Sequence, residues 1–315
     1  MQNIIKPQRL RKGDTIGFIA PSKHLSDDDR FIFKRTTAIL QQLGFNLKTS
    51  SHFFAVDRYG YSAGTAEERA ADIMEQFSDD SITGIWCWQG GQTANMVLDL
   101  LDYEFIEKHP KLFLGFSDNT VLLNAMYQKT GLITFHAPDP KVYPKEEPFA
   151  SEYSQAEFIN RLVNAEAGQI RKKSNWKVVR SGQANGKLFG GNLRSLLKLA
   201  GTPYWPEVVG AILLLEDNHI DIPEAEYMLT RLRHMGVFEK VSAVVVGYIY
   251  GFQHRYNRVV QFEDILLEIS RDFTFPILKI NEFGHKCHNT FLPIGGEAYV
   301  NTEKLKFALE PCISS

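Results

Sequence analysis

Cysteine is scarce in this 315-residue sequence, which contains only Cys87, Cys287 and Cys312. The count is odd and the three positions are spread along the chain, so they do not form the paired pattern of a disulfide framework. Free thiols persist in a reducing compartment, and the sequence therefore predicts a cytoplasmic protein.

Long apolar runs and an excess of charge of one sign are also missing. The most apolar stretch, 241–252, is well short of the roughly 20 residues that a membrane-spanning helix needs, and the first residues lack the apolar segment of a secretory signal. The 35 basic and 37 acidic side chains give a formal net charge of -2, without the basic excess typical of nucleic-acid binding. We therefore expect neither a membrane nor a nucleic-acid polymer as a partner.

Apolar residues, in contrast, make up 44% of the chain, enough for a sizeable core without disulfides or metal ions. At roughly 150 residues per domain, the length predicts two domains. We expect an N-terminal domain over 1–140, a connecting segment over 141–181 and a C-terminal domain over 182–315. The connecting segment is indicated by prolines and charges among which the regular pattern is lost.

The first 140 residues alternate between strand and helix patterns. Short apolar runs predict strands at 15–20, 83–88, 111–115 and 132–136, and helices are expected after the capping residues Ser26 and Thr65 and over 93–101 and 118–128. This alternation predicts an α/β fold with a doubly wound, mostly parallel sheet. Ligands of such sheets gather beyond the carboxyl ends of the strands, so the residues that follow each strand are candidates for a site.

The remainder of the chain indicates a mixed α/β C-terminal domain. Strands are predicted at 211–216, 241–249 and 275–280, a helix over 224–234, and a partly helical segment at 154–163 within the connecting segment. No internal repeat is visible.

The most informative stretch begins where the strand over 111–115 ends and Ser117 stands at the start of a helix. A nucleophile elbow needs this arrangement, because the sharp turn exposes the serine hydroxyl and the helix N-terminus favours negative charge. The backbone N–H of Asp118 would then face an oxyanion. Taken alone, the stretch is more commonly a plain helix cap, and Asn119 stands where the elbow motif has its second glycine.

A nucleophilic serine needs a base and a group that orients the base. His285 follows the strand over 275–280, in a loop where Gly284 permits an unusual backbone angle. Glu216 closes the apolar strand over 211–216, and a carboxylate there is either buried with a partner, for which a histidine would serve, or the start of a turn. His285 could equally be an ordinary loop histidine, so both roles stay open on these residues alone.

Two glycine pairs are also candidates for a site, one at the end of the predicted strand over 83–88 and one at the start of a helix. Gly90-Gly91 could present a backbone N–H to an oxyanion, and Gly190-Gly191 precedes Asn192 where a helix opens, so the backbone there can approach a ligand closely. Either pair could equally form a plain tight turn. Neither has the spacing of a dinucleotide fingerprint or a phosphate loop, and we expect no cofactor.

A metal site is not expected either. His285, Cys287 and His288 lie close together after Glu282, but zinc sites normally draw their ligands from two separated clusters. Cys287 is a less favoured alternative nucleophile, because no elbow surrounds it.

Taken together, these segments resemble the LD-carboxypeptidases and the microcin C immunity proteins, a family of serine peptidases, over nearly the whole chain. The matching segments, in chain order, are 17–22, 61–65 with Arg69, 90–91, 115–118, 190–193, 215–217, 284–285 with Asn289, and 292–295.

The resemblance implies a Ser–His–Glu triad in which Ser117 is the nucleophile, His285 the general base and acid, and Glu216 the group that orients the histidine. It also implies an oxyanion hole built from the backbone N–H groups of Gly91 and Asp118. The family fold is an N-terminal α/β domain joined to a C-terminal domain, with the active site in the cleft between them and a homodimeric assembly. The activity implied is serine-type hydrolysis of a peptide or amide bond.

Within the family, the sequence looks more like the microcin immunity branch. LD-carboxypeptidases typically carry an arginine before the first glycine pair and a tyrosine after it, where this sequence has Gln89 and Gln92. The immunity branch cleaves the amide that joins aspartate to a nucleotide phosphoramidate, so a peptidyl or aminoacyl nucleotide is the implied substrate. Gln89, Asn192 and Trp176 are the expected substrate-binding residues, with Trp176 a candidate to stack on the base or, alternatively, a packing residue.

Two other functions stay open. The first is a murein LD-carboxypeptidase, which removes the terminal D-alanine from a tetrapeptide. The second is a non-catalytic binding protein on the same fold, in which Ser117 is only a helix cap.

Overall fold

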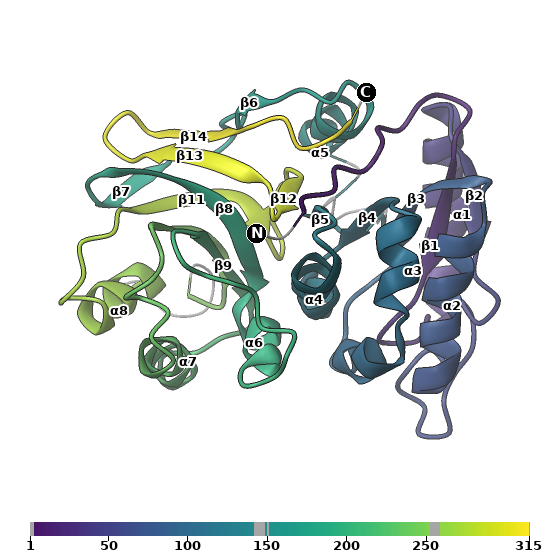
Figure 1. Cartoon of the computed structure of the whole chain (residues 1–315), viewed down its shortest axis with the longest axis horizontal. Helices are drawn as coiled ribbons and strands as arrows, with labels where there is room; N and C mark the ends of the chain where they lie inside the picture. Colours follow the sequence, from purple (N-terminus) through teal and green to yellow (C-terminus); the bar gives the residue numbers. More distant parts are fainter. Residues whose placement is uncertain (1–2, 142–148, 150, 253–258, 315) are drawn as a thin grey trace.

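The first half of the chain folds into alternating strands and helices, as the sequence predicts. The structure is a computed structural model that describes residues 3–141, 149, 151–252 and 259–314 (Figure 1). Its elements in this half are β1 (Thr15–Ile19), α1 (Asp27–Gln42), β2 (Asn46–Thr49), α2 (Ala66–Ser78), β3 (Ile82–Cys87), the 3-10 helix η1 (Ala94–Leu100), α3 (Tyr103–Lys108), β4 (Leu112–Gly115), the 3-10 helix η2 (Ser117–Asn119), α4 (Thr120–Thr130) and β5 (Thr134–His136).

The strands of this half lie side by side in the order β2-β1-β3-β4-β5, and every neighbouring pair is parallel. Their side chains alternate between two cores. On one face, Phe113 belongs to a buried cluster that includes Ile73 of α2, and on the other Trp86 belongs to a cluster that includes Ile32 of α1. The sheet is therefore doubly wound, and its chain order reverses beside β1, where ligands bind in folds of this kind.

Both predicted helix starts are confirmed. Ser26 and Thr65 accept hydrogen bonds from the backbone N–H groups of Asp29 and Glu68, whose carboxylates accept in turn from the cap N–H groups. The segment over 93–101 is a 3-10 helix rather than an α-helix. Strand β2 and helix α3 were not predicted, because elements of four and six residues are too short to display a period.

The second half adds a mixed sheet with helices on one face. Its elements are α5 (Glu152–Phe158), the π-helical turn η3 (Ile159–Val163), β6 (Gly168–Gln169), β7 (Lys177–Arg180), β8 (Gln183–Asn192), α6 (Leu193–Leu196), the 3-10 turn η4 (Leu197–Leu199), β9 (Ile212–Asn218), α7 (Ile222–His234), β10 (Ala243–Tyr250), α8 (Phe262–Ile269), β11 (Ile277–Gly284), β12 (Leu292–Ile294), β13 (Glu297–Asn301) and β14 (Lys306–Leu309).

Strands β8, β9, β10 and β11 are parallel neighbours, and β7 closes their edge in the antiparallel direction. Figure 1 shows α6, α7 and α8 beneath these strands and the hairpin of β13 and β14 above them. The predicted α/β fold class, with a mostly parallel N-terminal sheet and a mixed C-terminal unit, is confirmed.

Strand β12 joins the two halves into one sheet. It pairs with β5 of the first half in the antiparallel direction and with β8 of the second half in the parallel direction. Helix α4 strengthens the junction, because Asn124 donates to the Gly190 carbonyl (3.0 Å) and accepts from the Gly190 N–H (2.9 Å). These contacts fix the position of one half relative to the other, next to the segment that begins at Ser117.

The predicted connecting segment, 141–181, packs against the first half of the chain. Phe158, at the end of α5, stacks on Trp86 with 5.6 Å between ring centroids. Part of the segment, residues 142–148 and 150, lies outside the described residues. The boundaries at 140 and 182 stay a prediction.

Candidate active site

Ser117 stands at the turn between β4 and the helix that follows. Its backbone has a φ of 56°, in the left-handed region that residues other than glycine rarely adopt. The strain is typical of a nucleophile elbow, in which a tight strand-to-helix turn holds the serine hydroxyl away from the sheet. Asn119 secures the turn by donating from its side chain to the Gln89 carbonyl (3.1 Å).

His285 and Glu216 meet this serine from the other half of the chain. Nε2 of His285 lies 3.1 Å from Oγ of Ser117, and Nδ1 lies 2.6 Å from Oε2 of Glu216. Glu216 is on β9 and His285 directly follows β11, so the two residues flank β10. The structure therefore brings together the three residues that the sequence analysis assigned to a triad.

The ionisation of the histidine and the glutamate is coupled. Burial disfavours the imidazolium, but the charge and hydrogen bond of Glu216 outweigh this effect and raise the pKa of His285. Burial likewise disfavours the carboxylate, and here the charge and hydrogen bond of His285 prevail and lower the pKa of Glu216. Glu216 is fully buried, so its negative charge acts on the imidazole with little screening by water.

The loop after β3 lies against the Ser117 turn. A Cβ atom at Gly90 would lie 2.9 Å from Oγ of Ser117 and 3.0 Å from the backbone nitrogen of Asp118. A Cβ atom at Gly91 would lie 2.4 Å from Oγ of Ser22. Glycine at position 90 keeps open the space beside the serine hydroxyl and the Asp118 N–H, where a substrate oxygen would lie, and glycine at position 91 lets the loop pass close to Ser22.

Gln89 is buried beside this loop. Its side-chain nitrogen donates to the carbonyls of Lys23 (3.0 Å) and His24 (2.6 Å), and its oxygen accepts from the ammonium of Lys141. Lys141 also pairs with Asp29 of α1 at 2.6 Å. Gln89 thus fastens the loop after β3 to the loop after β1, and its predicted contact with a substrate stays a prediction.

Asn192 and Trp176, the other predicted substrate-binding residues, also have protein partners. Asn192 caps α6 by accepting from the Ser195 N–H (3.1 Å), and its side chain helps to keep Glu216 ionised. Trp176 is buried, and its indole N–H donates to Oε2 of Glu282 at 2.8 Å. These contacts support the packing interpretation of Trp176, while a contact with a substrate base stays a prediction.

His136 is a site residue that the sequence analysis missed. It ends β5, is fully buried, and its ring lies 5.3 Å from Phe116 and 5.7 Å from Phe283, measured between centroids. Burial lowers the pKa of His136 to about 4, so the ring is neutral at pH 7. No local motif marks this residue, because the charge of Glu216 acts on its ring only after the two halves have docked.

The described residues contain no group of three His, Cys, Asp or Glu side chains that could hold a metal ion. Within the same residues, no helix has both the length and the apolar character needed to cross a membrane. Burial raises the pKa of Cys287 well above its ordinary value, which keeps this thiol protonated.

The fold and the serine-centred site define a serine-type hydrolase that acts on peptide or amide bonds. The chain belongs to the LD-carboxypeptidase family, since residues 16–137 match the LD-carboxypeptidase N-terminal domain and residues 185–300 match the LD-carboxypeptidase C-terminal domain. The resemblance seen in the sequence is therefore confirmed.

Both branches of the family are represented among similar proteins. The microcin C7 self-immunity protein MccF of Escherichia coli is 30% identical, with 94% of this chain and 96% of its own length covered. The structure of MccF in complex with aspartyl sulfamoyl adenosine is 28% identical and superposes with a TM-score of 0.90, covering 98% of this chain and 100% of that one. A muramoyltetrapeptide carboxypeptidase from Oxalobacter formigenes is 26% identical, with a TM-score of 0.78 and coverage of 94% and 97%.

Proposed function

We propose that this protein is a serine amidohydrolase in which Ser117 is the nucleophile, His285 the general base and acid, and Glu216 the group that orients and charges the histidine. One observation carries the proposal: a continuous hydrogen-bond chain runs from Oγ of Ser117 through both ring nitrogens of His285 to the buried carboxylate of Glu216. The strained backbone of Ser117 supports the same assignment.

The chemistry follows from this geometry. Oγ of Ser117 attacks the amide carbonyl while Nε2 of His285 takes its proton, and the carbonyl oxygen becomes an oxyanion. The backbone N–H groups of Gly91 and Asp118 are the proposed donors to that oxyanion. When the C–N bond breaks, His285 returns the proton to the departing nitrogen, and a water activated in the same way hydrolyses the acyl-enzyme.

For the substrate, we propose a peptidyl or aminoacyl nucleotide cleaved at the amide between the amino acid and the nucleotide. The TM-score is higher for MccF with aspartyl sulfamoyl adenosine than for the muramoyltetrapeptide carboxypeptidase, 0.90 against 0.78. Gln89 and Gln92 also depart from the arginine and tyrosine typical of LD-carboxypeptidases. The role would be self-resistance or detoxification.

The second candidate is a murein LD-carboxypeptidase that releases the terminal D-alanine. It is favoured by the match to both LD-carboxypeptidase domains and by the muramoyltetrapeptide carboxypeptidase structure. Separate incubation with aspartyl sulfamoyl adenosine and with a murein tetrapeptide, followed by mass spectrometry, distinguishes the two. Release of sulfamoyl adenosine supports the nucleotide assignment, and release of D-alanine alone would reject it.

A non-catalytic binding protein is the third possibility. A fluorophosphonate that labels the wild type but not Ser117→Ala would exclude it. We also propose a cytoplasmic homodimer, as in the family, and light scattering coupled to size-exclusion chromatography tests the dimer directly.

A further inference from the structure

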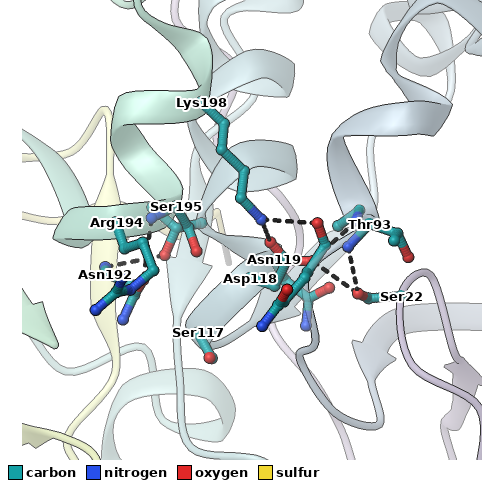
Figure 2. Close-up of polar contacts among 12 residues, drawn as sticks. Ser22, Thr93, Ser117, Asp118, Asn119, Asn192, Arg194, Ser195 and Lys198 are labelled. Carbon is teal, nitrogen blue, oxygen red and sulfur yellow. Dashed lines mark hydrogen bonds and ion pairs between the residues drawn. The ribbon is translucent and has the colours of Figure 1, made fainter. Parts of the chain in front are cut away.

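The carboxylate of Asp118 is a buried hub directly behind the Ser117 turn. Oδ2 accepts from the Ser22 hydroxyl at 2.7 Å and from the Ala94 N–H at 2.9 Å, and Oδ1 accepts from the ammonium of Lys198. Figure 2 shows Lys198 extending from its helical segment to Asp118, while Ser22 reaches the same carboxylate from a different side. A fully buried carboxylate needs such partners, because an unpaired charge in the interior is strongly disfavoured.

Lys198 comes from the second half of the chain, in η4, whereas Asp118 belongs to the first half. The same ammonium donates to the Gln92 carbonyl at 2.9 Å. Gln92 follows Gly91 in the sequence, so one cation holds both segments from which the proposed oxyanion donors come. Neither contact touches the serine hydroxyl itself.

Ser22 links the same two segments from within the first half. Its hydroxyl accepts from the Thr93 N–H at 3.1 Å and donates to Asp118. It is also close to Gly91, where an added Cβ atom would lie 2.4 Å from it. Two bridges, one through Ser22 and one through Lys198, therefore help to set the distance between the Gly91 loop and the Asp118 turn, together with the direct bonds from Asn119 to the Gln89 carbonyl and from the Ala94 N–H to Asp118. Oxyanion donors stabilise a transition state only when held at a fixed separation, because misplacement by a fraction of an ångström weakens both bonds.

We infer that Lys198 is a positioning residue for the oxyanion hole, through which the second half of the chain fixes the spacing between Gly91 and Asp118. The inference rests on the proposed function, since it concerns the hole that this function requires. Lys198 acts through the Asp118 carboxylate and the Gln92 carbonyl. Its loss should therefore affect the transition state, in which the oxyanion exists, far more than substrate binding.

The test compares Lys198→Met with wild type on aspartyl sulfamoyl adenosine, or on a murein tetrapeptide if the wild type cleaves only that. Methionine keeps much of the aliphatic stem but removes the charge and the donors. We expect kcat to fall by about 10- to 100-fold with KM changed less than about twofold, somewhat less than the loss of an oxyanion donor itself. Lys108→Met is the matched control, because Lys108 is an exposed lysine whose ion pair is with Glu104 of its own helix; its kcat should equal that of the wild type.

Chemical rescue separates positioning from a general structural role. Lys198 is 23% exposed, so Lys198→Ala leaves a gap that a small amine can enter from solvent. Added n-propylammonium should raise kcat of Lys198→Ala in a saturable way and leave Lys108→Met unchanged. If the Lys198 variants do not fold, Ser22→Ala cuts the other bridge and should show the same loss of kcat at nearly constant KM.

The outcomes distinguish the inference from the proposed function. An active wild type with unchanged kcat in Lys198→Met, or with a loss confined to KM, overturns the inference and leaves the proposed function intact. Loss of kcat in Lys198→Ala that n-propylammonium does not restore also counts against it. A wild type that cleaves no amide and reacts with fluorophosphonate no better than Ser117→Ala overturns both.

Discussion

Ser117 and His285 are separated by 168 positions in the sequence, yet Nε2 of the histidine lies 3.1 Å from the serine hydroxyl. The contact depends on the pairing of β12 with β5 and β8, which joins the halves of the chain. A hydrogen bond of this length allows direct proton transfer, so the two residues can act as nucleophile and base without an intervening water.

Replacement of Ser117 by alanine should abolish turnover while leaving the fold intact. In the proposed mechanism this hydroxyl forms the acyl-enzyme bond, so we expect kcat to fall by roughly 10⁴-fold or more, with the remaining rate due to binding and the oxyanion hole. Alanine also avoids a new steric conflict, so the thermal unfolding midpoint should change by only a few degrees. Steady-state kinetics and calorimetry on the same preparation check both statements, and a variant with more than a tenth of wild-type kcat would remove Ser117 from the mechanism.

The coupling of His285 to Glu216 predicts the acidic limb of the pH profile. The base must be neutral to accept the serine proton, so kcat/KM should rise with pH through the pKa of His285, which is raised above its ordinary value of 6.5. In Glu216→Gln the imidazolium loses its counter-charge while burial still disfavours it, so the limb should move to lower pH. The plateau should fall by about 10²- to 10⁴-fold, because the ring loses its orientation and its stabilised charge.

Asp272→Asn provides the control for this profile. Asp272 lies on the same half of the chain, is 55% exposed and pairs with Arg233 at 2.5 Å. Its substitution should leave the acidic limb in place. A limb that stays in place in Glu216→Gln as well would show that another group sets the pH dependence.

The same pair makes a signed prediction for stability. The pKa of His285 is raised on folding, so its contribution to the free energy of unfolding is complete below pH 6.5 and is lost as pH rises through the folded value. The pKa of Glu216 is lowered, so its contribution is present above pH 4.5 and is lost as pH falls through the folded value. The difference in unfolding free energy between wild type and Glu216→Gln should therefore be largest between these limits, and urea denaturation at several pH values measures it.

Local sequence made Ser117, Glu216 and His285 candidates because each of them lies at or just beyond the end of an apolar strand, whereas their assignment to a triad came from the family resemblance. Ser117 follows β4, Glu216 lies near the end of β9 and His285 follows β11, and in parallel sheets these ends meet at one edge. The doubly wound, mostly parallel sheet could be predicted because strand and helix patterns alternate over the first 140 residues.

The supporting contacts could not be predicted from local pattern. Nothing in the sequence near Lys198 distinguishes it from a surface lysine. Its contact with Asp118 exists only because Asn124 and β12 dock the two halves together. Trp176 is comparable. Its aromatic side chain is visible in the sequence, but its hydrogen bond to Glu282 joins residues 106 positions apart, which only the folded chain brings together.

Gly90→Ala tests the close approach between the loop after β3 and the nucleophile. The added methyl group would lie 2.7 Å from Cβ and 2.9 Å from Oγ of Ser117, closer than such contacts allow, and would fill the space reserved for the substrate oxygen. We expect kcat/KM to fall by at least about 10²-fold, in line with loss of oxyanion stabilisation. Gly60→Ala is the control, because nothing lies within 4 Å of the added atom; its φ of 73° strains an alanine, so the variant should lose some stability while its kcat/KM matches wild type. Near-normal activity in Gly90→Ala would contradict the placement of the oxyanion beside this glycine.

Arg69 supports the loops that carry Ser22 and the glycine pair, so its loss should act on stability. Its buried guanidinium donates to the carbonyls of Pro21 (2.7 Å), Thr93 (3.0 Å) and Thr65 (3.2 Å). In Arg69→Met the side-chain volume is largely kept but these carbonyls lose their donor, and we expect the free energy of unfolding to fall by about 3 kcal/mol. Urea denaturation measures this change, with Arg58→Met as an exposed arginine control that should stay within about 0.5 kcal/mol of wild type. A loss below about 1 kcal/mol in Arg69→Met would mean that water replaces the guanidinium and that the loops are fixed by Ser22 and Gln89 instead.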